Sequence, residues 1–335
     1  MLTYIIRRLV GLLFTVWGAL TIVFFLFFLL PDDPANLIAG GGSRPVPESV
    51  VKNVARKYGL DKPVYEQYVN YLGNVVTLNF GKSFKDDRDV SSIIGERAPA
   101  SVRLAIWAMA IEASVGISLG ILSAKRKNSL ADSATTVTAS VASAIPVFVL
   151  GYAFQQLTGV YAFDHDWPTW ARLPVQGLGP NDWFLGIIPS LEQLRSLVQP
   201  AIVLASVSTI IVARLTRTTM LETSKSDYIR TARAKGLTEG QITRKHTLRN
   251  AMIPVITFLG IDFGTLVGAA ILTETVFNWP GLGSKIVVAA EGRDLPTMVG
   301  LTTVVVFVYG FVNLLVDISY AWFDPRVRLG TKGSK

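Results

Sequence analysis

The sequence contains no cysteine, which excludes disulfides, thiolate metal sites and cysteine nucleophiles. Histidine occurs only twice, as His165 and His246, so no local cluster has the spacing of a metal site. Charged residues make up only 17% of the 335 residues, while 50% are hydrophobic. A composition so poor in charge predicts a polytopic membrane protein and not a soluble domain.

The sequence also lacks a phosphate-binding loop of the GxxxxGK[ST] type, in which backbone amides and a lysine hold nucleotide phosphates. Any ATP hydrolysis connected with this chain must therefore take place on another chain. A serine triad is not expected either, because the spans described below place the two histidines on opposite sides of a membrane. We therefore predict no catalytic residue, no metal site and no cofactor bound by this chain, and no enzymatic activity of its own.

Long apolar segments dominate what is present. The first, Leu9–Leu30, contains 22 residues without a charge, enough to cross a hydrocarbon core of about 30 Å at about 1.5 Å per residue. It is longer than the apolar region of a cleaved signal peptide, and Pro31 follows it, so we expect it to be retained. Five further spans are predicted at about residues 98–124, 133–159, 198–221, 251–277 and 297–323.

The basic residues lie mainly on one side of these six spans. Eighteen of the 32 Lys and Arg fall on the side that holds both termini, against five acidic residues. Residues 31–97, on the other side, carry nine basic and nine acidic residues, which cancel. By the positive-inside rule, both termini and the loop of residues 222–250 are predicted to be cytoplasmic. This topology accounts for most of the net charge of +8, so nucleic-acid binding is not needed to explain it.

Two longer segments are predicted to be external. Residues 31–97 contain a mixed-charge run, Glu48–Val76, whose apolar residues recur near helical spacing. This pattern predicts a small external helical cap, and a passive ordered loop fits the same spacing equally well. Residues 160–197 form the other external loop, in which three tryptophans, Trp183 among them, suit the membrane interface.

The cytoplasmic loop of residues 222–250 carries the signals of a short helix and its end. Ser226 or Asp227 can cap a helix that begins at Tyr228, because a short side-chain oxygen accepts a backbone N–H of the first turn. Gly236 then supplies a left-handed stop. The first helix has only about two turns, too few for stability in isolation, so we expect it to dock against something.

A second helix begins directly after this stop. Leu237 is placed for the apolar contact that often follows a glycine cap. Thr238 and Gln241 have the spacing of a capping box, which starts a new helix. We call residues 227–250 the elbow. Any basic loop would satisfy the positive-inside rule, so the order of residues in the elbow, and not its charge, carries the functional signal.

Several short motifs follow one another from Gly95 onward. They are GERAPASVRLA (95–105), SAIPVFVLG (143–151), RLPVQGLG (172–179), ARLTRTTMLE (213–222), the elbow, TETVFNWPGLG (273–283), RDLP (293–296) and NLLVDISYAWFDPRVR (313–328). Together they resemble the ABC-transporter inner-membrane permeases of the dipeptide and oligopeptide permease family, specifically the first of its two permease subunits. One such motif would be weak, but the ordered set is very specific.

The resemblance implies an all-α polytopic fold, the type I ABC importer permease, with six transmembrane helices and an external helical insert. Residues 1–30 would hold the cytoplasmic N-terminus and first helix, 31–97 the insert, 98–323 a five-helix core and 324–335 a cytoplasmic tail. The core would contain the external loop 160–197 and a coupling loop at 222–250.

The resemblance also implies the partners. These are a second homologous permease subunit, two ATPase domains that bind ATP and Mg, and an external peptide-binding protein, assembled at the inner membrane of a bacterium. The coupling loop of such permeases inserts a short helix into a groove of the ATPase. By position, this contact falls on Asp227, Tyr228, Arg230, Thr231, Ala232, Lys235, Gly236 and Leu237. Arg230 stands where the general version of the loop has Glu. This departure argues against a Glu-mediated contact with the ATPase but not against the docking mode.

Small residues repeat at four-residue spacing within two spans. They are Gly116 and Gly120 in the second span and Gly260, Gly264 and Gly268 in the fifth. Small residues at this period let helices approach closely, so we predict passive packing faces.

Acidic residues within the spans need a polar environment. Asp262 lies nearly opposite the glycine stripe of its helix at about 100° per residue, and a carboxylate facing lipid costs about 2.5–3.5 kcal/mol or more. Glu112 and Asp317 pose the same question, and Glu274 lies near the outer end of the fifth span. We predict that Asp262 and Glu274 line or gate the path and meet a peptide's amino terminus. Hydrogen bonding to the second permease subunit is an equally weighted alternative.

The leading function is therefore ATP-driven import of di- or oligopeptides. The same machinery importing nickel, glutathione or another small solute is the alternative, because relatives of such permeases serve those solutes. A stand-alone channel or membrane scaffold is the hypothesis from another class, and the elbow would have no purpose in such a protein.

Overall fold

The computed structural model describes residues 2–30, 33–39, 46–130, 132–133, 137–138, 141, 144–179 and 182–323. The chain forms two compact units: Met1–Ser101 with Pro280–Lys335, and Val102–Trp279. Five helices of the described part are long and apolar enough to cross a membrane: Ile6–Leu29, Val90–Lys125, Leu191–Thr223, Glu239–Val276 and Leu295–Val316. The third predicted span, 133–159, lies partly outside the described residues. The predicted tail 324–335 and the side chain of Asp317 lie wholly outside them.

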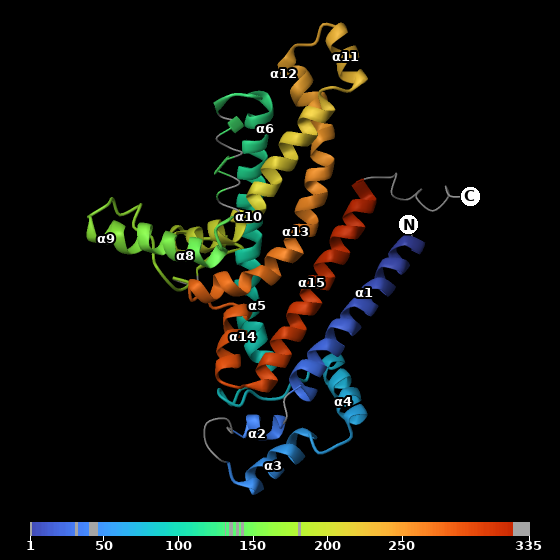
Figure 1. Ribbon diagram of the computed structural model, residues 1–335, viewed down its shortest axis with the longest axis vertical. Coiled ribbons are helices and arrows are strands. Elements are labelled where there is room, and N and C mark those ends of the chain that lie inside the picture. The colour runs from blue at the N-terminus through green and yellow to red at the C-terminus, as the bar shows by residue number, and fades with distance from the viewer. Residues whose placement is uncertain are drawn as a thin grey trace. The chain divides into compact units, whose positions relative to one another are not determined.

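The first unit is built on two long helices that lie side by side (Figure 1). They are α1 (Leu2–Phe24), which continues as the π-helical turn η1 (Phe25–Leu29), and α15 (Leu295–Phe323). Gly310 permits this approach, because a Cβ there would lie 2.6 Å from Cδ1 of Leu12. The short helix α14 (Leu282–Glu291) precedes α15 and packs against it.

The helix-compatible run Glu48–Val76 of the predicted insert forms two helices and not one. They are α3 (Glu48–Tyr58) and α4 (Val64–Val76), preceded by the short α2 (Pro34–Ile38). Gly59 ends α3 in the left-handed conformation, with φ of 65°, and the chain turns there.

The insert is anchored to the long helices of its unit by aromatic side chains. The ring of Phe24 lies 5.1 Å from that of Tyr68 and 5.7 Å from that of Tyr71. Tyr71 is buried, and its hydroxyl lies 3.2 Å from Oγ1 of Thr303 on α15. Burial raises the pKa of the Tyr71 hydroxyl. The insert is therefore packed onto the spans through α4.

The second unit is organised around α10 (Leu191–Thr223), which packs against helices on two sides. The helix α5 (Val90–Ile111) begins in the first unit, ends in the second, and continues through η2 (Glu112–Gly116) into α6 (Ile117–Lys125). A Cβ at Gly116 would lie 2.8 Å from Val212, and one at Gly120 would lie 2.5 Å from Thr216. The segment η2–α6 therefore runs in close contact along α10, and α13 (Leu248–Val276) packs against α10 as well.

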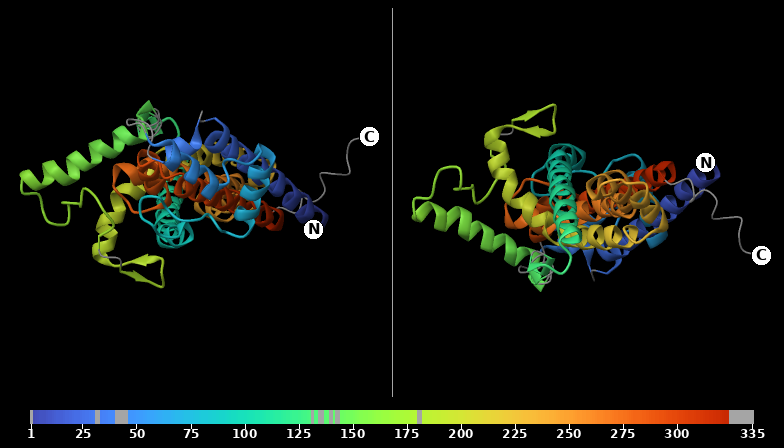
Figure 2. Two further views of the ribbon diagram at one scale, coloured as in Figure 1. Left: turned by 90° about the horizontal axis from the view of Figure 1, so that it is seen from below. Right: turned by 90° about the horizontal axis from the view of Figure 1, so that it is seen from above.

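The segment between α6 and α10 contains the shorter elements of this unit. These are α8 (Val147–Gln155), η3 (Gln156–Tyr161), α9 (Ala162–Asp164), and the hairpin strands β1 (Trp183–Phe184) and β2 (Ile188–Pro189). In Figures 1 and 2, α8 runs across the direction of α10 and not along it.

Several predicted boundaries differ from the structure. The second span begins at Val90 and not at 98, and the fourth at Leu191 and not at 198, because polar turns extend these helices beyond their apolar parts. The third predicted span is not one uninterrupted helix, since the chain leaves helical geometry at Ile145 and Pro146 before α8 begins. Moreover, α14 and α15 belong to the unit that holds α1 and the insert, so the compact units divide the predicted 98–323 core.

Candidate functional site

The elbow has two short helices joined by a tight turn, and both stop and start signals are present. The first helix, α11, spans Asp227–Ala234, and the second, α12, spans Glu239–Ile242. Gly236 adopts the predicted left-handed conformation, with φ of 81°. In the predicted capping box, the backbone N–H of Thr238 donates to Oε1 of Gln241 at 3.1 Å, and that of Gln241 donates to Oγ1 of Thr238 at 3.4 Å.

One predicted cap is wrong. Ser226 occupies the N-cap position of α11, but no side-chain oxygen bonds the first turn there. Asp227 is the first residue of α11, and its carboxylate lies 3.3 Å from Nη1 of Arg230, an i,i+3 ion pair exposed to solvent. Arg230 therefore has a partner on its own helix.

A small apolar core holds the two arms of the elbow together. It consists of Ile229, Ala232 and Ile242, all buried, with Leu237 packed against them. Sequence reasoning did not single out Ile229, although it and Ala232 have the i, i+3 spacing of one helix face. Two side-chain contacts brace this core.

The first brace is an ion pair across the turn. Nε and Nη2 of Arg233 donate to the two carboxylate oxygens of Glu239 at 2.6 and 3.2 Å, which lowers the pKa of Glu239. The second brace ties α11 to the first turn of α13, because Nδ2 of Asn250 donates to the hydroxyl of Tyr228 at 2.9 Å. The elbow is thus a closed unit that is continuous with α10 at one end and α13 at the other.

The residues predicted for coupling separate into an exposed and an inward-facing set. Ala232 and Leu237 face the core of the elbow. The exposed members are Asp227, Tyr228, Arg230, Thr231, Lys235 and Gly236. The surface that a partner can contact is therefore polar and partly basic, with the ring of Tyr228 as its aromatic member.

The structure brings Asp262 next to Glu112 and not next to Glu274. Asp262 on α13 is 8% exposed, Glu112 at the start of η2 is fully buried, and the two carboxyl groups lie close to each other. Within the described residues, three carboxylate oxygens of this pair have no hydrogen-bond partner: both oxygens of Glu112 and Oδ2 of Asp262. Glu274 is fully buried twelve residues further along α13, about 18 Å away along the helix axis.

The glycines predicted for packing occupy different surroundings. Gly116 and Gly120 lie where α10 approaches most closely, as described above. Gly264 is buried and Gly260 is half-buried on α13. A Cβ at Gly268 would meet nothing within 4 Å among the described residues.

A charged cluster lies near the ends of α6 and α10 that lead toward the elbow. Nε and Nη2 of Arg217 donate to the two carboxylate oxygens of Asp132 at 2.7 and 2.8 Å. The hydroxyl of Ser123 and the backbone N–H of Asn128 also donate to this carboxylate. These bonds, led by those from Arg217, hold the pKa of Asp132 well below its usual range. They fix the turn after α6 to α10.

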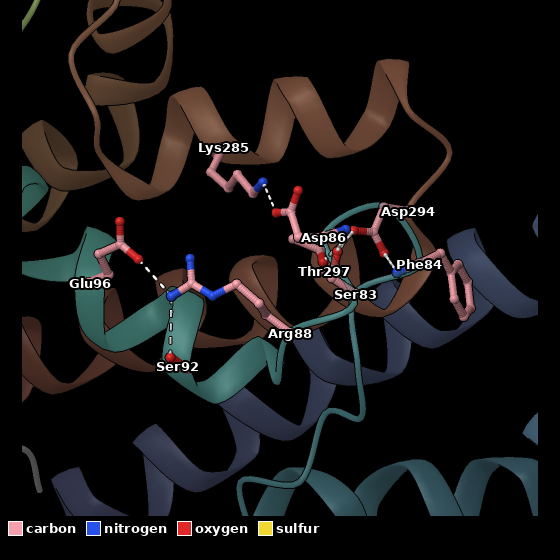
Figure 3. A network of polar contacts seen from close by, with 9 residues as sticks. All are labelled: Ser83, Phe84, Asp86, Arg88, Ser92, Glu96, Lys285, Asp294 and Thr297. Carbon is pink, nitrogen blue, oxygen red and sulfur yellow. Dashed lines mark hydrogen bonds and ion pairs between the residues drawn. The ribbon is translucent and has the colours of Figure 1, made fainter.

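A second polar network lies in the first unit, at the RDLP motif (Figure 3). Asp294 is 1% exposed and accepts hydrogen bonds from Oγ of Ser83 at 2.5 Å, the N–H of Phe84 at 3.0 Å and Oγ1 of Thr297 at 2.6 Å. The ammonium of Lys285 lies 2.5 Å from Asp86, which lowers the pKa of that carboxyl. The network binds the loop after α4 to α14 and α15.

Ion pairing continues along α5 in the same network. Nη2 of Arg88 donates to Oε2 of Glu96 at 2.8 Å and to Oγ of Ser92 at 3.4 Å (Figure 3). Arg88 lowers the pKa of Glu96. Neither here nor elsewhere in the described part of the chain do three His, Asp or Glu side chains converge as metal ligands would.

Comparison with known proteins decides the family. The family described as the binding-protein-dependent transport system inner membrane component matches residues 116–329, and the N-terminal region of such membrane components matches residues 1–105. The chain belongs to this family. It is therefore a multi-pass inner-membrane subunit of a transport system, as the ordered motifs predicted, and the permease resemblance and all-α membrane fold class are confirmed.

Relatives of the permease cover it along nearly its whole length. The dipeptide transport system permease protein of Alkalihalophilus pseudofirmus is 35% identical over 98% of this chain and 100% of its own. The di/tripeptide transport system permease protein of Pseudomonas aeruginosa is 35% identical over 98% and 99%. The glutathione transport system permease protein of Escherichia coli is 36% identical over 98% and 99%. Permeases for peptides and for glutathione, itself a peptide, are thus similar to this one.

Proposed function

We propose that this permease forms half of the membrane path of an ATP-driven importer of di- or oligopeptides. A second homologous permease supplies the other half, and an external peptide-binding protein delivers the solute. Two ATPase domains hold ATP and Mg on the cytoplasmic side. The names of the relatives support the solute class, and the elbow supports the coupling to ATPase chains.

The single observation that carries the proposal is the construction of the elbow. Its apolar side chains close on themselves, so the surface offered to a partner is polar, with Tyr228, Arg230 and Lys235 exposed. A short turn, residues 224–226, joins the elbow to α10, and its other end runs into α13. A partner that binds the elbow and changes conformation therefore moves α10 and α13 together. An ATP-driven transporter requires this kind of coupling.

The topology of the proposal follows the distribution of charge. The elbow and both termini are cytoplasmic, since Lys and Arg concentrate on that side, and the insert is external. In this orientation the elbow meets ATPase chains and the insert meets the peptide-binding protein.

Retention of the ATPase during purification tests the coupling. We expect Arg230→Ala and Lys235→Ala to reduce the ATPase that co-purifies with the permease, and to reduce peptide uptake in proportion. Lys127→Ala is the matched control, because Lys127 is an exposed basic residue outside the elbow, and it should leave both unchanged. A permease that never associates with an ATPase would be a channel or scaffold, and the proposal would be wrong.

Competition in uptake tests the solute. Radiolabelled dipeptide should enter cells that carry the permease, and unlabelled di- and tripeptides should compete for entry. Glutathione is the second candidate, favoured by the glutathione permease that is 36% identical to this chain. Competition by glutathione but not by dipeptides would assign it instead, and nickel uptake without either would remove the peptide class.

The path residues are tested by removing one charge at a time. If Asp262 and Glu274 line or gate the path, Asp262→Asn lowers peptide uptake at unchanged ATPase retention. Glu112→Gln distinguishes a role of the adjacent pair from a role of Asp262 alone. Unchanged uptake and unchanged coupled ATP hydrolysis in Asp262→Asn would remove Asp262 from the mechanism.

A further inference from the structure

A short β-hairpin before α10 presents an apolar tip outside the core of its unit. Strand β1 pairs antiparallel with β2, with Trp183 opposite Pro189 and Phe184 opposite Ile188. Leu185 and Gly186 make the turn, with φ of 52° and 73°. The side chains of Phe184, Leu185 and Leu191 are 68%, 78% and 78% exposed, and Ile187 and Ile188 are about half exposed. Both views of Figure 2 show the hairpin as an arm that extends away from α10.

The hairpin is held in this position by α5. Nε of Arg103 donates to the carbonyl oxygen of Gly186 at 2.7 Å, and Nε1 of Trp107 donates to that of Ile187 at 3.0 Å. The guanidinium of Arg103 also lies over the ring of Trp183, 4.6 Å from its centroid. The turn is therefore tied to α5 through its backbone carbonyls, while its apolar side chains stay exposed.

Distances along two helices place the hairpin at the level of a membrane surface. Arg103 and Lys125 lie 22 residues apart on the helix Val90–Lys125, or about 33 Å at 1.5 Å per residue. Leu191 and Arg214 lie 23 residues apart on α10, or about 35 Å. Both separations match the hydrocarbon thickness of about 30 Å with a small margin. If Lys125 and Arg214 lie at one membrane surface, Arg103 and the hairpin therefore lie at the other surface.

The chemistry of the segment suits that level. No charged residue occurs from Trp183 to Leu191, and α10, a candidate span, begins directly after the hairpin. Arg103 beside it can face lipid phosphates while its stem stays in apolar surroundings. Exposed apolar side chains in a cluster mark a surface that another phase or partner covers.

We propose that the hairpin of residues 183–191 inserts its tip into the lipid leaflet at the end of α10 away from the elbow. Phe184, Leu185 and Leu191 lie among the upper acyl chains, and Arg103 lies at the phosphates. The hairpin thereby fixes the depth of α5 and α10 in the bilayer. The assignment depends on the spans and not on which solute the permease carries.

A single-cysteine label measures this depth without background, because the chain has no cysteine. Leu185→Cys carries a nitrobenzoxadiazole fluorophore, and the full permease, with the chains that co-purify with it, is placed in nanodiscs of phosphatidylethanolamine and phosphatidylglycerol. We expect quenching by lipids with a nitroxide near the headgroup. We also expect quenching by aqueous iodide about threefold weaker than at an aqueous position, as for a side chain buried in the interface.

Two control labels calibrate the readout. Glu48→Cys, on the exposed surface of the insert, reports aqueous quenching, and Leu13→Cys, on the exposed apolar face of α1, reports lipid quenching. Leu191→Cys provides a second label in case the turn does not tolerate a fluorophore at Leu185. Iodide quenching equal to that at Glu48→Cys would place the hairpin in water and overturn the proposal. Insensitivity to both quenchers would show that protein covers the tip, which also overturns it.

Discussion

Gly116 and Gly120 are the residues that set the distance between α10 and the helix beside it. At Gly120, a Cβ would lie 2.5 Å from Cβ of Thr216 and 2.6 Å from the carbonyl oxygen of Ala213. The second of these atoms belongs to the backbone, so relief requires the helices to separate. Between membrane helices, such close approach is a main source of association energy.

Gly120→Ala is expected to destabilise the permease by about 1–3 kcal/mol, as overpacking of a tight contact does. Thermal unfolding in nanodiscs, followed by loss of helix signal, measures the change. Gly268→Ala is the matched control, because a Cβ there meets nothing within 4 Å in the described structure. It should be neutral or stabilising by up to about 1 kcal/mol, since alanine favours a helix over glycine. Equal effects of the two substitutions would contradict the close approach at Gly120.

The pair of Asp86 and Lys285 predicts an acid-dependent stability. The ammonium of Lys285 holds the pKa of Asp86 below its usual range. A lowered folded-state pKa stabilises above the unfolded pKa of about 3.9, and this contribution is lost as the pH falls through the folded-state value. Lys285→Met should therefore lower the unfolding temperature at pH 7, and the difference from the unchanged permease should shrink below pH 4.

An exposed ion pair provides the control for this titration. Lys52 lies 2.7 Å from Glu48 on α3, but both side chains are more than 60% exposed, at 67% and 80%. Lys52→Met should change the unfolding temperature by little at any pH, because exposed pairs contribute about 0–1 kcal/mol. A difference for Lys285→Met that persists unchanged in acid would assign its effect to packing and not to charge.

At the scale of elements, the elbow combines local signals with one contact that only the fold provides. Its glycine stop and its capping box depend on residues within four positions of one another, so the sequence specifies them directly. The hydrogen bond from Asn250 to Tyr228 joins residues 22 positions apart, and no short sequence pattern predicts it.

Ile229→Ala is expected to loosen the elbow while leaving the spans folded. Ile229 is fully buried in the three-residue core of the elbow, and removal of such a side chain costs about 2–4 kcal/mol. Amide exchange should accelerate in α11 and α12 and remain unchanged in α10. Peptide uptake per ATP hydrolysed should fall, because a loosened elbow transmits less movement. Tyr228→Phe, which removes only the hydroxyl contact, should produce a smaller effect; protection of α11 unaltered in Ile229→Ala would argue against a closed core.

The sequence predicted elements better than it predicted their contacts. Apolar length located five spans that the described structure contains, and helical spacing located the insert, because these signals are local. The starts of α5 and α10 were misplaced, because polar first turns are helical for reasons of packing and capping, such as the bond from the N–H of Gln193 to Oγ of Ser190. The placement of Glu112 beside Asp262 required the fold, since 150 residues separate them.

At the scale of the whole molecule, the number of crossings fixes which surfaces share a compartment. Asn74 on α4 and Lys235 in the elbow are separated by the spans predicted at 98–124, 133–159 and 198–221. With three crossings they lie on opposite sides of the membrane. If the segment of α8 does not cross, two crossings remain and the two residues share a side.

We expect an impermeant maleimide to react with Asn74→Cys in intact cells, and with Lys235→Cys only after permeabilisation. Both positions are exposed, and the absence of natural cysteine removes background labelling. Arg7→Cys should likewise react only after permeabilisation, because the N-terminus is predicted to be on the same side as Lys235. Reaction of Lys235→Cys and Asn74→Cys under the same conditions would show that the 133–159 segment does not span.

The π-helical turn η4 (Thr243–Thr247) connects α12 with α13, and its i→i+5 bonds accommodate one residue more than an α-helical turn. Each residue advances a helix by about 100°, so this turn sets the phase of the elbow around the axis of α13. No substitution that preserves chain length changes that phase by a fixed step. Deletion of a single residue between Thr243 and Thr247 would rotate the elbow by one such step around the axis of α13. α11 would then face a different neighbour, while the core of the elbow stayed intact.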